Sequence, residues 1–111
     1  MTASPCIFGD YLKRLIQEAD MTQVAFYTAL GIKKPYFYDI LSGRANPPPP
    51  ALQFRIMDIL GADEDTRIAF FDLAARVRGE MPADIASLAS ENPAFIRNIR
   101  HNLKRLLTPQ R

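Results

Sequence analysis

The chain has very few residues of the kinds that form catalytic centres and metal sites. Cys6 is its only cysteine and His101 its only histidine, so neither an intrachain disulfide nor a cysteine-based metal site is possible. The sequence also has no glycine-rich phosphate loop and no nucleophile motif. Without a cluster of histidine, cysteine and carboxylate residues, we expect the protein to be no enzyme and to hold no cofactor or metal ion.

Long apolar runs are absent as well. A membrane-spanning helix needs about 20 consecutive apolar residues, and no run in this sequence approaches that length. The first ten residues, MTASPCIFGD, lack the basic start and the apolar centre of a secretory signal. Because a lone thiol suits a reducing compartment, we expect a cytoplasmic protein with no membrane partner.

No segment alternates between apolar and polar residues with the period of a strand, and this predicts an all-α fold. Apolar residues instead recur at helical spacing, with capping residues and prolines at the ends of the segments. The four prolines at 47–50 predict a stiff extended linker, since consecutive prolines favour polyproline II. The predicted helices cover residues 7–19, 22–30, 34–41, 51–60, 64–78, 82–90 and 93–107.

The apolar positions also predict which side of each helix is buried. In the first helix they are Phe8, Leu12, Leu15, Ile16 and Ala19. In the fifth helix they are Ile68, Phe71, Val77 and either Leu73 or Ala74. In the sixth helix they are Ile85 and either Leu88 or Ala89.

Residues 21–47, MTQVAFYTALGIKKPYFYDILSGRANP, carry the clearest functional pattern. Thr22 is a suitable N-cap for a short helix that ends at Gly31. After a short turn, Phe37 and Ile40 lie on one face of a second short helix. Two short helices joined by a turn that contains glycine form a helix-turn-helix, whose second helix enters the major groove of DNA.

The segments MTQ, LGI, KPYFYDILSG and RANP lie within residues 8–61, which resemble the Xre/Cro-type family of phage and bacterial transcriptional regulators. The resemblance implies a five-helix, lambda-repressor-like fold and a DNA-binding repressor or Cro-like regulator, usually a homodimer. Residues 63–93 are similar to the second half of a prophage-encoded subgroup with a short helical extension. We therefore expect a helix-turn-helix DNA-binding domain over residues 6–62 and a helical extension that pairs subunits over residues 63–111.

The motif departs from the family pattern at one position. The family normally has a small residue where the first motif helix crosses close to the second, and this chain has Tyr27 there. Either the Tyr27 ring points outward at the rim of the motif, or the two helices cross at a wider separation.

Ten residues are candidates for contact with double-stranded DNA. Because Phe37 and Ile40 face the core, the opposite side of the second motif helix can reach base edges. The start of the first motif helix offers free amides to a phosphate, and the resemblance implies a backbone or base contact for Gln23. Residues after the second helix can clamp the sugar-phosphate chain on its other side. The ten are Thr22, Gln23, Lys33, Lys34, Pro35, Tyr38, Asp39, Ser42, Arg44 and Asn46.

The side chains of this set suit different contacts. Lys33 or Lys34 can donate to guanine, and Asp39 can accept from a cytosine amine. Tyr38 can lie against a thymine methyl group or donate to a phosphate. The lysines and Arg44 also fit a solvated face, and Asp39 can instead pair with a neighbouring lysine.

Charge is segregated in the second half of the chain. Residues 92–111 hold five basic residues and no acid, whereas residues 63–91 are acidic. The last helix also carries a broad apolar stripe, which either pairs two subunits or folds back onto the core of its own subunit. Its basic face can meet the acidic segment of a partner subunit, or DNA. The stripe, our candidate dimer interface, consists of Phe95, Ile96, Ile99, Leu103, Leu106 and Leu107.

Three functions fit these patterns. The leading hypothesis is a sequence-specific, repressor-like regulator of transcription that binds a palindromic operator as a homodimer, with an antirepressor protein as a further candidate partner. The second is an antitoxin that represses its own operon while its C-terminal region binds a toxin. The third is a protein-interaction adaptor that has the fold but does not bind DNA.

Overall fold

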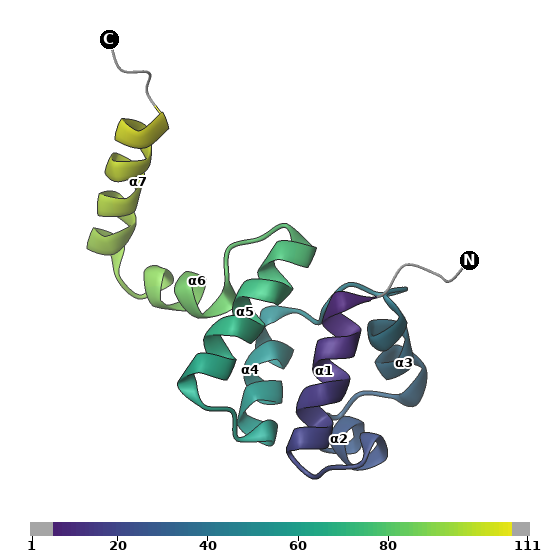
Figure 1. The fold of residues 1–111 in the computed structure, drawn as a ribbon. Coiled ribbons are helices and arrows are strands. Elements are labelled where there is room, and N and C mark those ends of the chain that lie inside the picture. The colour runs from purple at the N-terminus through teal and green to yellow at the C-terminus, as the bar shows by residue number, and fades with distance from the viewer. Residues whose placement is uncertain (1–5, 108–111) are drawn as a thin grey trace.

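The computed structural model describes residues 6–107; residues 1–5 and 108–111, including the basic Arg111, lie outside the described residues. The described part is all-helical, with seven helices and no strand (Figure 1). Each predicted helix is confirmed to within one residue at either end. The helices are α1 (Ile7–Glu18), α2 (Gln23–Leu30), α3 (Lys34–Ser42), α4 (Pro50–Leu60), α5 (Glu64–Arg78), α6 (Ala83–Ser90) and α7 (Pro93–Leu107).

Helices α1 to α5 share one aromatic-rich core. Phe26 and Phe37, from the two motif helices, are fully buried with ring centroids 5.8 Å apart. On the other side of α1, the Phe8 ring lies 5.4 Å from that of Phe70, which belongs to α5. The fifth helix therefore packs in the same core as the four helices before it, although it lies beyond residue 62.

Local capping explains why these helices begin where they do. The Thr22 hydroxyl accepts from the Ala25 amide at 3.0 Å, and the Asp63 carboxylate accepts from the Thr66 amide at 2.8 Å. Cys6 caps α1, since its Sγ accepts from the Gly9 amide at 3.3 Å. Side-chain acceptors of this kind satisfy amides that have no partner within the helix, so each helix start is set locally.

The predicted inner face of α5 is partly wrong. Ile68 and Val77 are about half exposed, at 47% and 49%. Because α5 packs against both α1 and α4, it buries a wide face, and the two excluded residues flank that face on either side. The buried residues are Phe70, Phe71, Ala74 and Ala75.

The predicted inner face of α6 is also partly wrong, since of the residues predicted to form it only Ala89 is buried. Ile85 and Leu88 are exposed, whereas Ala83 and Ala89 are buried. This short helix therefore turns its small residues toward its neighbours and leaves its larger apolar side chains at the surface.

Helix α7 leads away from the body formed by α1 to α5, at the end of the molecule opposite α3 (Figure 1). It packs on α6, but none of its own residues is buried. Its apolar stripe therefore does not complete the core of its own subunit.

The Asp63 cap makes stability depend on pH. Hydrogen bonds from the Thr66 side chain and amide hold the pKa of Asp63 below its ordinary value. The carboxylate therefore stabilises the fold above its unfolded pKa of about 4, and this contribution is lost as pH falls through the lower folded pKa. Asp63→Asn keeps an acceptor but has no charge to lose. In thermal unfolding from neutral pH to about pH 3, the variant should lose less stability than the wild type; equal losses would contradict this role.

Candidate nucleic-acid interface

The second motif helix, α3, presents a polar face on the side away from the core. Phe37, Ile40 and Leu41 are buried and attach the helix to the body. Lys33 precedes the helix as its N-cap residue and is exposed. The exposed residues within the helix are Lys34, Pro35, Tyr38 and Ser42, while Asp39 is half-buried. Neither the core nor α7 covers this face.

A side-chain hydrogen bond joins the two motif helices at this surface. The Tyr38 hydroxyl donates to Oε1 of Gln23 at 3.0 Å, and the Tyr38 ring packs edge-on against Phe37 at 5.2 Å. The bond fixes the start of α2 relative to the exposed face of α3. Sequence reasoning placed both residues at the interface but missed their pairing, because it depends on how two separate helices cross.

The start of α2 has the free donors that a phosphate requires. Thr22 uses its hydroxyl as the helix cap, and the first intrahelical hydrogen bond is the one from the Phe26 amide to the Thr22 carbonyl, at 3.0 Å. The amides of Gln23 and Val24 therefore have no intrahelical partner. These backbone groups, rather than the Thr22 hydroxyl, are the donors that can meet an anion here.

The end of α3 contains an ion pair between two of the candidate residues. The Arg44 guanidinium lies 3.2 Å from the Asp39 carboxylate, so Asp39 pairs with Arg44 rather than with Lys33 or Lys34. Both side chains are substantially exposed, and an exposed pair of this kind contributes at most about 1 kcal/mol. A phosphate can therefore compete for Arg44 at little cost.

The backbone after α3 is tied to the helix as well. The Asp39 carbonyl accepts from the Ala45 amide at 3.0 Å and from the Ser42 hydroxyl at 3.2 Å. Asn46 follows and is exposed. Arg44 and Asn46 thus lie on a short, ordered segment beside the last turn of α3.

Tyr27 and Arg55 complete the contacts around the motif. Tyr27 is half-buried, with its ring centroid 5.3 Å from that of Phe37, so the ring packs between α2 and α3. Arg55, from α4, donates to the Ala29 carbonyl at 3.1 Å and satisfies the C-terminal end of α2. The sequence does not indicate this role of Arg55, because it comes from the packing of α4 on α2.

Two further features, a metal site and a membrane-spanning helix, are absent from residues 6–107. No three histidine, cysteine, aspartate or glutamate side chains gather there where they could hold a metal ion. The same residues contain no helix with the length and apolar character needed to cross a bilayer.

Comparison with known proteins agrees with this geometry. A family model described as a helix-turn-helix domain matches residues 7–70, more than half of the chain. No curated protein and no solved structure matches the chain. The matched segment spans α1 to α4 and the first half of α5, including both motif helices and all of the aromatic core except Phe71. Proteins with this domain typically bind DNA and are not enzymes. The chain therefore belongs to the helix-turn-helix domain family, with α2 and α3 as the two helices of its motif.

Proposed function

We propose that this protein is a sequence-specific, repressor-like regulator of transcription of the Xre/Cro type, which binds a palindromic operator in double-stranded DNA as a homodimer. The observation that carries the proposal is the uncovered polar face of α3, opposite the buried Phe37 and Ile40. A regulator of this kind acts where the genome lies, in the cytoplasm of a bacterium or of a phage-infected cell.

In the proposed complex, α3 lies in the major groove and its exposed side chains contact base edges. Lys33 and Lys34 donate to guanine acceptors, and Tyr38 lies against a thymine methyl group while Gln23 holds its hydroxyl. Asp39 reads a cytosine amine when Arg44 leaves it for a phosphate. Pro35 and Ser42 line the same face and complete its shape.

Phosphate contacts on both sides of α3 provide most of the affinity and its salt dependence. The free amides at the start of α2, next to Thr22, receive one phosphate. Arg44 and Asn46 receive another beyond the end of α3.

Two copies are needed because one short motif contacts only a few base pairs. Operators for such motifs have half-site centres about 34 Å apart, and we propose that α7 joins the two subunits. Phe95, Leu103, Leu106 and Leu107 are exposed on α7, and Ile96 and Ile99 are half-buried. Between α6 and α7 lies a groove of about 190 Å³, lined by Met81, Ala89, Ile96, Ile99, Arg100 and Leu103. This apolar surface supports a second copy as the partner.

The proposal is tested by selecting bound sites from random double-stranded DNA at several salt concentrations. We expect an enriched palindrome whose half-sites lie about one helical turn, 34 Å, apart or a multiple of it. Affinity should fall steeply as salt rises, because binding releases counterions. A selection that enriches no sequence would remove the proposed function and favour the adaptor hypothesis.

Replacing both lysines of the recognition face gives a sharper test. Lys33 and Lys34 are exposed, so the double variant K33Q/K34Q should fold normally. Its affinity for the selected site should fall at least about tenfold, since a good base contact discriminates by about 1–3 kcal/mol. The matched control is K13Q/R14Q, which removes the same charge from α1, where these residues pair with Asp10 and Glu18. Equal affinities for the two double variants would contradict a specific role of the lysines.

A further inference from the structure

The linker that follows the recognition helix contains buried carbonyl groups that it cannot satisfy itself. Pro47 and Pro48 are buried, and Pro49 has the extended backbone of polyproline II, with φ −65° and ψ 164°. That conformation makes no internal hydrogen bonds. A buried carbonyl without a donor is costly, so donors must come from elsewhere in the chain.

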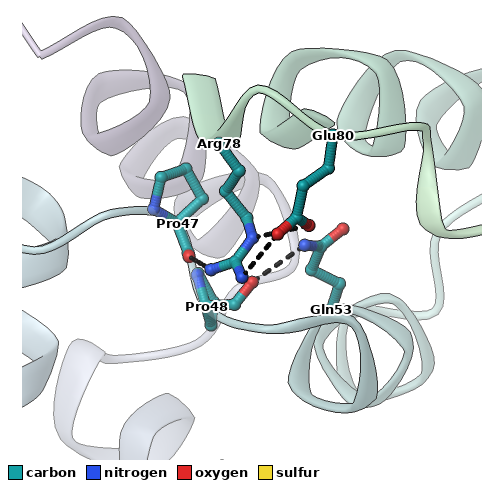
Figure 2. Close-up of polar contacts among 5 residues, drawn as sticks. All are labelled: Pro47, Pro48, Gln53, Arg78 and Glu80. Carbon is teal, nitrogen blue, oxygen red and sulfur yellow. Dashed lines mark hydrogen bonds and ion pairs between the residues drawn. The ribbon is translucent and has the colours of Figure 1, made fainter. Parts of the chain in front are cut away.

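Two side chains from outside the linker provide these donors. Nη1 of Arg78, the last residue of α5, donates to the Pro47 carbonyl at 2.8 Å. Nε2 of the buried Gln53, from α4, donates to the Pro48 carbonyl at 2.8 Å. Figure 2 shows both side chains converging on the two adjacent carbonyls. The proline run is therefore attached to α4 and α5 rather than free in solvent.

The Arg78 guanidinium is itself held in place by Glu80. Its Nε and Nη2 donate to the two carboxylate oxygens of Glu80, both at 3.0 Å (Figure 2). Arg78 thus uses all three guanidinium nitrogens in one fixed orientation. A lysine has the charge but not the planar fork, so it cannot reproduce this arrangement. The hydrogen bonds to Arg78 also hold the pKa of Glu80 below its ordinary value.

The position of the Pro47 carbonyl matters because of what precedes it. Arg44 and Asn46, the proposed phosphate contacts after α3, lie between two attachment points. The upstream point is the Gly43 amide, bonded to the Ile40 carbonyl at 3.3 Å, and the downstream point is the Pro47 carbonyl bonded to Arg78. A segment held at both ends loses less conformational entropy when it binds DNA.

We infer that Arg78, held by Glu80, is a positioning residue for DNA binding. By fixing the Pro47 carbonyl it orders Arg44 and Asn46 beside the end of α3, although it does not itself touch DNA. This inference rests on the proposed function. It adds a residue of α5, outside the motif helices and the linker, to those that determine the affinity for DNA.

The test compares Arg78→Lys and Glu80→Gln with a control variant at another arginine of α5. Arg67, on α5, forms an exposed ion pair with Asp58 of α4 at 3.5 Å and has no contact with the linker among its hydrogen bonds. Arg67→Lys is therefore the matched control. Binding is measured on a duplex that carries the site enriched by the wild type, at a temperature where every variant is folded.

We expect Arg78→Lys to weaken binding roughly five- to tenfold, because two side chains must then be ordered on binding. Glu80→Gln should weaken it less, and Arg67→Lys should leave it unchanged. Hydrogen exchange of the Ala45 amide should accelerate in Arg78→Lys and not in the control. If Arg78→Lys is less stable than the control, the same comparison is made with Glu80→Gln, which alters the exposed partner of Arg78 and leaves the arginine itself in place.

A double-mutant cycle separates positioning from general stability. In the R44A/N46A background, Arg78→Lys should cause no further loss of affinity, because the residues it orders are gone. Additive losses would overturn the inference, as would wild-type affinity and wild-type Ala45 exchange in Arg78→Lys. Both outcomes leave the proposed function intact, since they presuppose a selected site that the wild-type protein binds. Absence of any such site would instead remove the proposed function.

Discussion

Gly9→Ala is expected to lower the free energy of unfolding by about 3 kcal/mol or more, at the upper end of the cost of overpacking. Gly9 lies in α1 at its closest approach to α3. A Cβ atom added there would overlap the Leu41 carbonyl oxygen and would lie 2.7 Å from the Leu41 carbonyl carbon and 2.8 Å from its Cα. These are backbone atoms of α3, so no side chain can rotate to relieve the clash. Chemical denaturation monitored by circular dichroism measures the effect.

Whether Gly9→Ala lowers or raises the free energy of unfolding shows which of two opposing effects is larger. In an ordinary helix position, replacing glycine with alanine stabilises the fold by roughly 1 kcal/mol, so helix propensity and the clash oppose each other at Gly9. Gly79→Ala is the control, because a Cβ there meets no atom within 4 Å and the residue has a φ of +72°. Gly79→Ala should lower the free energy of unfolding by only about 1–2 kcal/mol, because alanine must adopt the left-handed backbone there. A Gly9→Ala protein as stable as the wild type would contradict this prediction, because it would show that α1 and α3 can move apart without a loss of stability.

Helix positions were predictable because their signals are local. The Thr22 and Asp63 caps act on amides three residues further on, so the sequence around them contains the whole interaction. The faces of α5 and α6 were not predictable in the same way. Ile68 and Leu88 fit an inward stripe, but which side is buried depends on how many neighbours each helix contacts.

In the candidate interface too, local features were predictable and contacts beyond the reach of helical spacing were not. The exposed face of α3 followed from the burial of Phe37 and Ile40, which helical spacing alone predicts. The pairing of Asp39 with Arg44 was missed because Arg44 lies beyond the end of α3, where helical spacing no longer applies. The contact from Arg78 to Pro47 joins residues 31 positions apart. The only sequence signal for it was the proline run itself, whose buried carbonyls need a donor from somewhere.

Leu106→Glu is expected to reduce affinity for the full palindromic site on the order of 100-fold, because a joined second motif binds at a high effective concentration. Leu106 is 79% exposed in the single chain, so its replacement removes almost no contact within the subunit and should leave the melting temperature unchanged. The charge would instead lie within the apolar stripe that we propose a second copy covers. Sedimentation should detect a monomer in place of the dimer that we propose for the wild type.

Two controls separate loss of pairing from loss of DNA contact. Asn98→Glu adds the same charge to α7 at an exposed position outside the stripe, and this variant should remain a dimer. A duplex with one half-site should bind Leu106→Glu and the wild type equally, because α3 is unchanged and lies at the opposite end of the molecule. A wild-type protein that stays monomeric with and without the full site would refute pairing through α7. Its uncovered stripe would then require a different protein as partner, as the antitoxin hypothesis does.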